Sequence, residues 1–127
     1  FVSRALTCWC GSKGVTIIPV PSRKKRKNFQ GDHLDPVLRY LQRSYGYTVL
    51  KCLRRVGKVP QKSLSYRERL KNLQGQIAFR KGFPLPQGKI VLFDDIFTTG
   101  ATTDECARVL LENGGSEILV LTLGIEQ

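Results

Sequence analysis

The chain is poor in several residue types, and each shortage narrows what it can do. Its 127 residues include no methionine, one tryptophan, one histidine and four cysteines. A chain that begins at Phe1 and lacks methionine is expected to be a fragment or a processed product. The cysteines form no Cys-x-x-Cys pair, and the Cys8-Trp9-Cys10 spacing has no second pair or histidine cluster to complete four ligands. We therefore expect no zinc site, and we expect Cys52 and Cys106 to be small core residues.

Long apolar runs are also missing. No segment is long enough to cross a bilayer, and no signal-peptide pattern occurs. The sequence contains neither the Gly-x-x-x-x-Gly-Lys-Ser/Thr phosphate loop nor the Gly-x-Gly-x-x-Gly dinucleotide fingerprint. With 41% apolar residues, the chain is expected to be one cytoplasmic domain over residues 1–127, with no membrane insertion.

Acidic residues are scarce in the middle of the chain. Residues 22–72 hold 15 of the 21 Lys and Arg and only three acids, a balance of +12, whereas the remainder sums to −1. Such a field attracts polyanions, although it also suits a solvated surface, which is the simpler explanation for Arg39 and Arg43. Five consecutive cations repel one another unless they are solvated or partnered, so an anion-contacting loop is predicted at 23–27. The candidate nucleic-acid contacts are Lys24, Lys25, Arg26 and Lys27.

Apolar periodicity predicts alternating strands and helices. Strands are expected over 15–20, 48–53, 77–79, 90–93 and 117–123, the last of them buried, and helices over 32–45 and 103–113. Asp35 before Pro36 suggests the cap of the first helix. The residues expected to face the core are Leu34, Val37, Leu38, Leu41 and Tyr45 on the first helix, and Ala107, Leu110 and Leu111 on the second. This order predicts an α/β fold, a parallel sheet with helices on both faces, whose ligands bind beyond the carboxyl ends of the strands.

The segment 89–102 carries the strongest functional signal. An apolar strand is expected to end at Asp94 and Asp95, followed by a loop of hydroxyl and small residues and then a helix. The loop residues can wrap a phosphate, because glycine lets the backbone come close and free N–H groups at a helix start favour an anion. They are Thr98, Thr99, Gly100, Ala101 and Thr102. The alternative is an ordinary strand–turn–helix connection with a Thr or Asp cap.

The whole run is more specific than an ordinary connection. Apolar residues, Asp-Asp, two intervening residues and Thr-Thr-Gly-x-Thr together resemble the phosphoribosyl-diphosphate (PRPP) motif of type I phosphoribosyltransferases. Across residues 15–123 the order of features is also similar to the competence protein F (ComF) family. The matching segments are Ile18-Pro-Val-Pro-Ser-Arg23, Pro60-Gln-Lys-Ser-Leu64, Asn72-Leu-Gln-Gly75 and Glu105-Cys-Ala-Arg108. Cys8 and Cys10 do not match the spacing of the family's N-terminal zinc ribbon, so we expect that this ribbon is absent and that the domain is shortened at its N-terminus.

The resemblance implies a type I phosphoribosyltransferase-like fold and a set of roles. Asp94 and Asp95 would be the catalytic pair that binds the ribose hydroxyls, the loop 98–102 would hold the 5′-phosphate, and Mg²⁺ would be bound through PRPP rather than by a protein metal site. The diphosphate would be met by Ser22, Arg23, Lys62 and Arg67, the last two from a hood over 54–72. A surface ion pair with Glu68 is the alternative for Arg67.

The expected activity is transfer of a phosphoribosyl group from PRPP to an unknown acceptor with release of diphosphate, linked to DNA uptake. The alternatives are a non-catalytic PRPP sensor and a single-stranded DNA-binding protein, in which Tyr40, Tyr45, Tyr47 and Tyr66 could stack on bases. A homodimer is left open.

Overall fold

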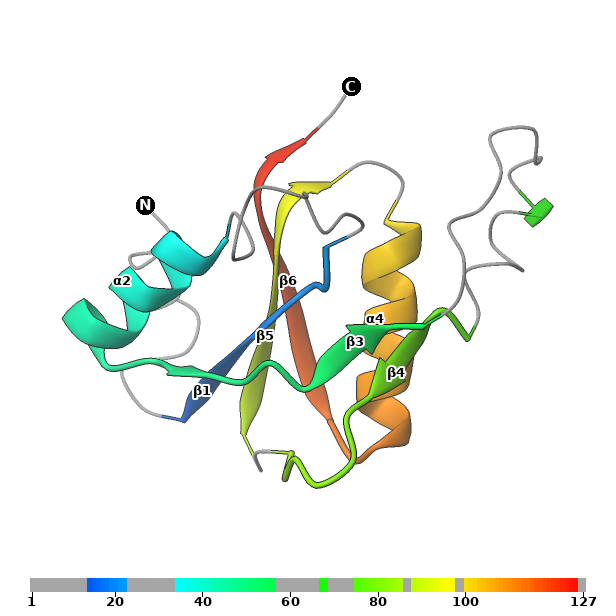
Figure 1. Cartoon of the computed structure of the whole chain (residues 1–127), viewed down its shortest axis with the longest axis horizontal. Helices are drawn as coiled ribbons and strands as arrows, with labels where there is room; N and C mark the ends of the chain where they lie inside the picture. Colours follow the sequence, from blue (N-terminus) through cyan, green and yellow to red (C-terminus); the bar gives the residue numbers. More distant parts are fainter. Residues whose placement is uncertain are drawn as a thin grey trace.

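The core of the protein is a parallel sheet with the strand order β2-β1-β5-β6 (Figure 1). Its strands are β1 (Val15–Pro19), β2 (Thr48–Val49), β5 (Lys89–Phe97) and β6 (Glu117–Ile125). The computed structural model describes residues 14–22, 34–56, 67–68, 75–85, 88–97 and 100–125, and the structural statements below concern these residues. All three strand pairings are parallel, which agrees with the fold class expected from the sequence.

Each face of the sheet is covered by one helix. Successive residues of a strand point to opposite faces, and the two central strands are apolar at every step. Ile17 and Phe93 pack with α2 (Asp35–Tyr45), whereas Ile18 and Leu92 pack with α4 (Ala101–Glu112). All four of these strand side chains are fully buried. The prediction of helices on both faces is confirmed.

The segment expected to form one strand over 48–53 is divided between two sheets. β2 ends at Val49, the Leu50 N–H still bonds to Ile17 O at 2.9 Å, and the chain then leaves the main sheet. It continues as β3 (Leu53–Arg55), which pairs antiparallel with β4 (Ile77–Phe79). Leu53 and Ile77 of this second sheet pack with α4. The burial of these two side chains stabilises the second sheet.

Helix α2 departs from its predicted start and its predicted inner side. It begins at Asp35 with Leu34 as the N-cap, so Asp35 lies in the first turn and bonds to Lys51 instead of capping the helix. Leu38 and Leu41 are buried as expected, whereas Tyr45 is 50% exposed. The helix ends as predicted at Gly46, whose left-handed φ of 70° costs glycine little.

The last helix and strand are less buried than predicted. Helix α4 begins at Ala101, two residues before the expected start, and its inner side is formed by Cys106, Val109 and Leu110. Leu111 lies about 100° further round the helix and is exposed, so its predicted inward position is wrong. Strand β6 is an edge strand rather than a fully buried one, with Leu123 and Ile125 exposed. None of the described helices has the length and apolar character needed to cross a membrane.

Candidate functional site

The acidic pair lies inside strand β5 rather than at its end. The strand was expected to end at the two aspartates but continues to Phe97, with Asp94 in register with Thr122 of β6. Both aspartates are half-buried. Each carboxylate accepts a hydrogen bond from the next backbone amide: Asp95 N–H to Asp94 Oδ1 at 2.9 Å, and Ile96 N–H to Asp95 Oδ1 at 2.8 Å. These local bonds fix both side chains at the carboxyl end of the central strands.

Burial raises the pKa of Asp94 to about 6. Desolvation is the largest cause, and a hydrogen bond with the Asp95 carboxyl and the charge on Asp95 act in the same direction. The backbone amide of Asp95 and the positive charge of Arg55 oppose this rise. At neutral pH the Asp94 carboxyl is therefore mostly ionised, although it binds its proton close to the physiological range.

Arg55 is a site residue that our sequence analysis missed. Its Nε donates a hydrogen bond to Pro21 O at 3.0 Å, which joins β3 to the segment that follows β1. Its positive charge also lowers the pKa of Asp94. The sequence did contain a signal for the position of Arg55, because side chains alternate between the two faces of a strand. Leu53 is buried and Arg54 is exposed, so Arg55 returns to the inner face.

The end of β1 is joined to β5 just before the acidic pair. The Val20 N–H donates to Phe93 O at 2.8 Å, which brings the exposed Ser22 to the same edge of the sheet. Arg67 is exposed and helical. The other predicted diphosphate and nucleic-acid contacts, Arg23, Lys24, Lys25, Arg26, Lys27 and Lys62, lie outside the described residues.

The predicted phosphate loop is described only in its second half. Gly100 is the N-cap of α4 and adopts φ 77°, a conformation that favours glycine. Its carbonyl accepts bonds of 2.8 Å from the Thr103 hydroxyl and the Asp104 N–H. Ala101 and Thr102 were predicted in the loop but belong to the first turn of α4; Thr98 and Thr99 lie outside the described residues.

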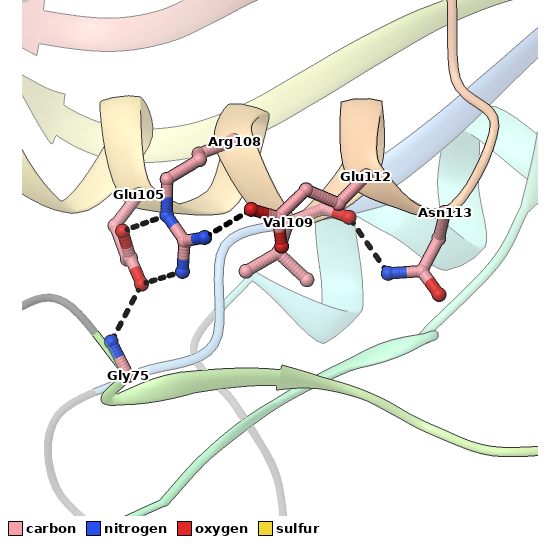
Figure 2. A network of polar contacts seen from close by, with 6 residues as sticks. All are labelled: Gly75, Glu105, Arg108, Val109, Glu112 and Asn113. Atoms are coloured by element: carbon pink, nitrogen blue, oxygen red, sulfur yellow. Dashed lines mark hydrogen bonds and ion pairs between the residues drawn. The ribbon is translucent and has the colours of Figure 1, made fainter.

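A polar network joins the middle of α4 to the start of β4 (Figure 2). The buried Glu105 receives two bonds from Arg108, at 2.7 and 2.8 Å, and a third from the Gly75 N–H at 2.9 Å. Arg108 also pairs with the exposed Glu112 one turn further on. The hydrogen bonds from Arg108 are the main cause that lowers the pKa of Glu105. Helix α4 is thereby fixed to the backbone just before β4.

The described part of the chain holds no group of three or more His, Cys, Asp or Glu side chains that could bind a metal ion. Cys52 and Cys106 are fully buried, as predicted for core residues. Burial raises the pKa of Cys52 to about 11 and that of Cys106 to about 12, so both remain thiols at neutral pH. Cys8 and Cys10 lie outside the described residues.

A parallel α/β sheet with paired carboxylates at the carboxyl end of its central strand is compatible with a phosphoribosyltransferase-like fold. No protein-family model matches the chain. Over 63 residues, half of its length, it is 41% identical to the "DNA utilization protein YhgH" of Escherichia coli K12. It is also 35% identical over 51 residues to an orotate phosphoribosyltransferase of Parvibaculum lavamentivorans, and 46% identical over 43 residues to that of Helicobacter acinonychis.

The matched segments cover 27%, 26% and 21% of these relatives, about a quarter of each. Within this chain they cover 50%, 39% and 33%. These partial matches support a phosphoribosyltransferase-like relationship.

Proposed function

We propose that the protein binds PRPP at the carboxyl ends of β1 and β5 and transfers its 5-phosphoribosyl group to an acceptor, releasing diphosphate. The observation that carries the proposal is the half-buried pair Asp94 and Asp95, held by backbone amides at the end of a central parallel strand. Ligands of open α/β sheets bind at this edge. The Gly100 cap and the partial matches to two orotate phosphoribosyltransferases add support.

In this proposal the residues act by positioning and by electrostatics. Asp94 and Asp95 accept hydrogen bonds from the two ribose hydroxyls, and the segment 98–102 receives the 5′-phosphate at the start of α4. The bond between ribose C1 and the diphosphate oxygen breaks, and its electron pair leaves with the diphosphate. The acceptor forms a new bond to C1 and loses a proton. The two carboxylates stabilise the positive charge that develops on the ribose.

Mg²⁺ fits this site as an ion carried in by PRPP. No described cluster of side chains could bind it alone, and Mg²⁺ prefers phosphate oxygens and water. Its chemistry would be to neutralise the charge of the diphosphate. The residues that would meet the same diphosphate are those after β1, beginning at Ser22, together with Arg67 and Lys62.

Thermal unfolding with and without PRPP tests the binding step. A ligand that binds only the folded state stabilises it by about 2.7 kcal/mol at one hundred times its Kd, which raises Tm by several degrees for a chain of this size. Ribose 5-phosphate and diphosphate alone are the controls. No shift with PRPP and Mg²⁺ would contradict the proposal. Diphosphate release over purine, pyrimidine and amine acceptors then separates an enzyme from a PRPP sensor.

PRPP affinity should depend on the protonation of Asp94. Its pKa of about 6 means that the carboxylate is ionised above that pH, whereas below it the group is protonated and lacks the charge that strengthens a hydrogen bond from a ribose hydroxyl. If only the ionised form binds ribose, the apparent affinity falls about tenfold between pH 7 and pH 5. Because the PRPP phosphates also titrate near pH 6, Asp94→Asn is the control, and its affinity should show only the ligand's own pH dependence. Parallel pH curves for the two proteins would reject this role of Asp94.

A second candidate function is the handling of single-stranded nucleic acid. The chain has a formal net charge of +11, and its partial relatives in Escherichia coli and Salmonella typhi are named DNA utilization proteins. Binding of a single-stranded oligonucleotide that weakens steeply with salt would support it. Failure to bind at low salt would exclude it.

A further inference from the structure

Tyr45 contacts two other tyrosines at the carboxyl-terminal end of α2. The rings of Tyr40 and Tyr45 meet edge to face with centroids 5.8 Å apart, and Tyr45 stacks on Tyr47 at 6.3 Å with 29° between the planes. Tyr47 is buried against the core, whereas Tyr40 is 58% and Tyr45 50% exposed. Two large aromatic surfaces thus face solvent above a third ring that anchors them.

The exposed rings are held in place by the structure beneath them. Tyr47 packs in the cluster of α2 and the sheet, and its N–H donates to Leu41 O at 3.4 Å. Gly46 turns the chain between Tyr45 and Tyr47. A hydrogen bond with Tyr45 is also the largest cause that raises the pKa of Tyr40. Rings that are already ordered lose little conformational freedom when a flat ligand stacks on them.

Positive charge adjoins these rings. Arg39 and Arg43 are exposed and lie one turn apart on α2, so they are neighbours on the helix surface, and Arg43 is also one turn from Tyr40. The acidic residue of this helix, Asp35, forms an ion pair with Lys51. A ligand with flat apolar groups and regularly spaced negative charges matches this surface.

We infer that Tyr40 and Tyr45 form a base-stacking site for single-stranded nucleic acid, with Arg39 and Arg43 contacting its phosphates. The inference rests on the second candidate function, and it adds a surface separate from the acidic pair. Helix α2 packs on the face of the sheet opposite α4, and Figure 1 shows its carboxyl-terminal end far from the start of α4. The ligand is a single strand because, in a duplex, the faces of each base are already covered by the neighbouring bases.

The test compares two double tyrosine variants and one double arginine variant of the full chain by fluorescence anisotropy with a labelled strand of about 20 thymidines. Tyr40→Ser with Tyr45→Ser removes both rings and should weaken binding about a hundredfold, since stacking contributes about tenfold per base. Tyr40→Phe with Tyr45→Phe keeps the rings and should bind within about threefold of the wild type. The serine variant should leave the salt slope unchanged, whereas Arg39→Ser with Arg43→Ser should reduce it by about 1.4.

The outcomes separate this inference from the function on which it rests. A wild-type chain that binds no single strand would overturn both. A wild type that binds, together with a serine variant that melts like it and binds equally well, would overturn only the tyrosine site. Equal losses in the serine and phenylalanine variants would also overturn it, because stacking needs the ring and not the hydroxyl. Affinity for a duplex, measured in parallel, should be the same for the wild type, the serine variant and the phenylalanine variant.

Discussion

Asp94→Asn with Asp95→Asn should reduce PRPP affinity at least a hundredfold and leave the fold intact. Each substitution keeps the shape of the side chain but removes the charge that strengthens a hydrogen bond from a ribose hydroxyl. A hydrogen bond to a charged group contributes about 1.5–3 kcal/mol, so losing two of them costs more than about 3 kcal/mol of binding energy. The measurement is PRPP titration by calorimetry at pH 7.5, where the Asp94 carboxyl, with a pKa of about 6, is ionised.

The double variant is not expected to unfold, because both side chains are only half-buried and an uncharged amide avoids the desolvation that raises the pKa of Asp94. Glu117→Gln is the control, because it also removes a carboxylate from the sheet. Glu117 lies at the exposed start of β6, where its Oε1 is 4.0 Å from Lys89 Nζ. This control variant should bind PRPP as the wild type does. An Asn double variant with unchanged affinity would remove the acidic pair from the proposed site.

Glu105→Ala should lower the free energy of unfolding by about 2 kcal/mol at pH 7. The substitution leaves the Gly75 N–H and one side of Arg108 without the partner shown in Figure 2. Losing a buried charged hydrogen-bond partner costs about 1.5–3 kcal/mol, and water partly compensates Arg108, whose side chain is 41% exposed. Urea denaturation measures the effect.

Glu112→Ala provides the comparison, because it removes the other carboxylate that pairs with Arg108. Glu112 is exposed, so its loss should cost only about 0.5 kcal/mol. The pH dependence of stability tests Glu105 further. The pKa of Glu105 is lowered in the folded protein, so its stabilisation is present above the unfolded pKa of about 4.5 and is lost as the pH falls through the folded value. Equal destabilisation by the two substitutions would show that burial of Glu105 has no special effect.

The fold class followed from local patterns. The apolar run at β5 and the β-branched run at β1 predicted buried parallel strands, because only a strand covered on both faces is apolar at every position. The acidic pair and Gly100 were also visible as residue types at fixed spacing. Their sequence order placed them near a strand end and a helix start, although both boundaries were off by a few residues.

Other features depended on contacts between distant segments. The 48–53 run has the composition of one strand, but it changes sheets after Leu50, because β4 offers a second edge with which β3 pairs. Leu111 and Tyr45 are apolar or aromatic on amphipathic helices, yet they face solvent, because each helix meets the sheet along a narrower stripe than the pattern suggested. Our reading of the sequence also overlooked the effect of the Arg55 charge on Asp94, because the two residues lie on different sheets.

By itself, the sequence determined the alternation of strands and helices, the basic middle segment and the carboxylates that precede a glycine-capped helix. These features depend on residue type and spacing within about fifteen positions. The tertiary structure alone decided how strongly Asp94 holds its proton, which carboxylate of α4 is buried, and which tyrosines face solvent. Those properties depend on burial and on charges from other elements, and a linear pattern does not specify which surfaces the folded chain removes from water.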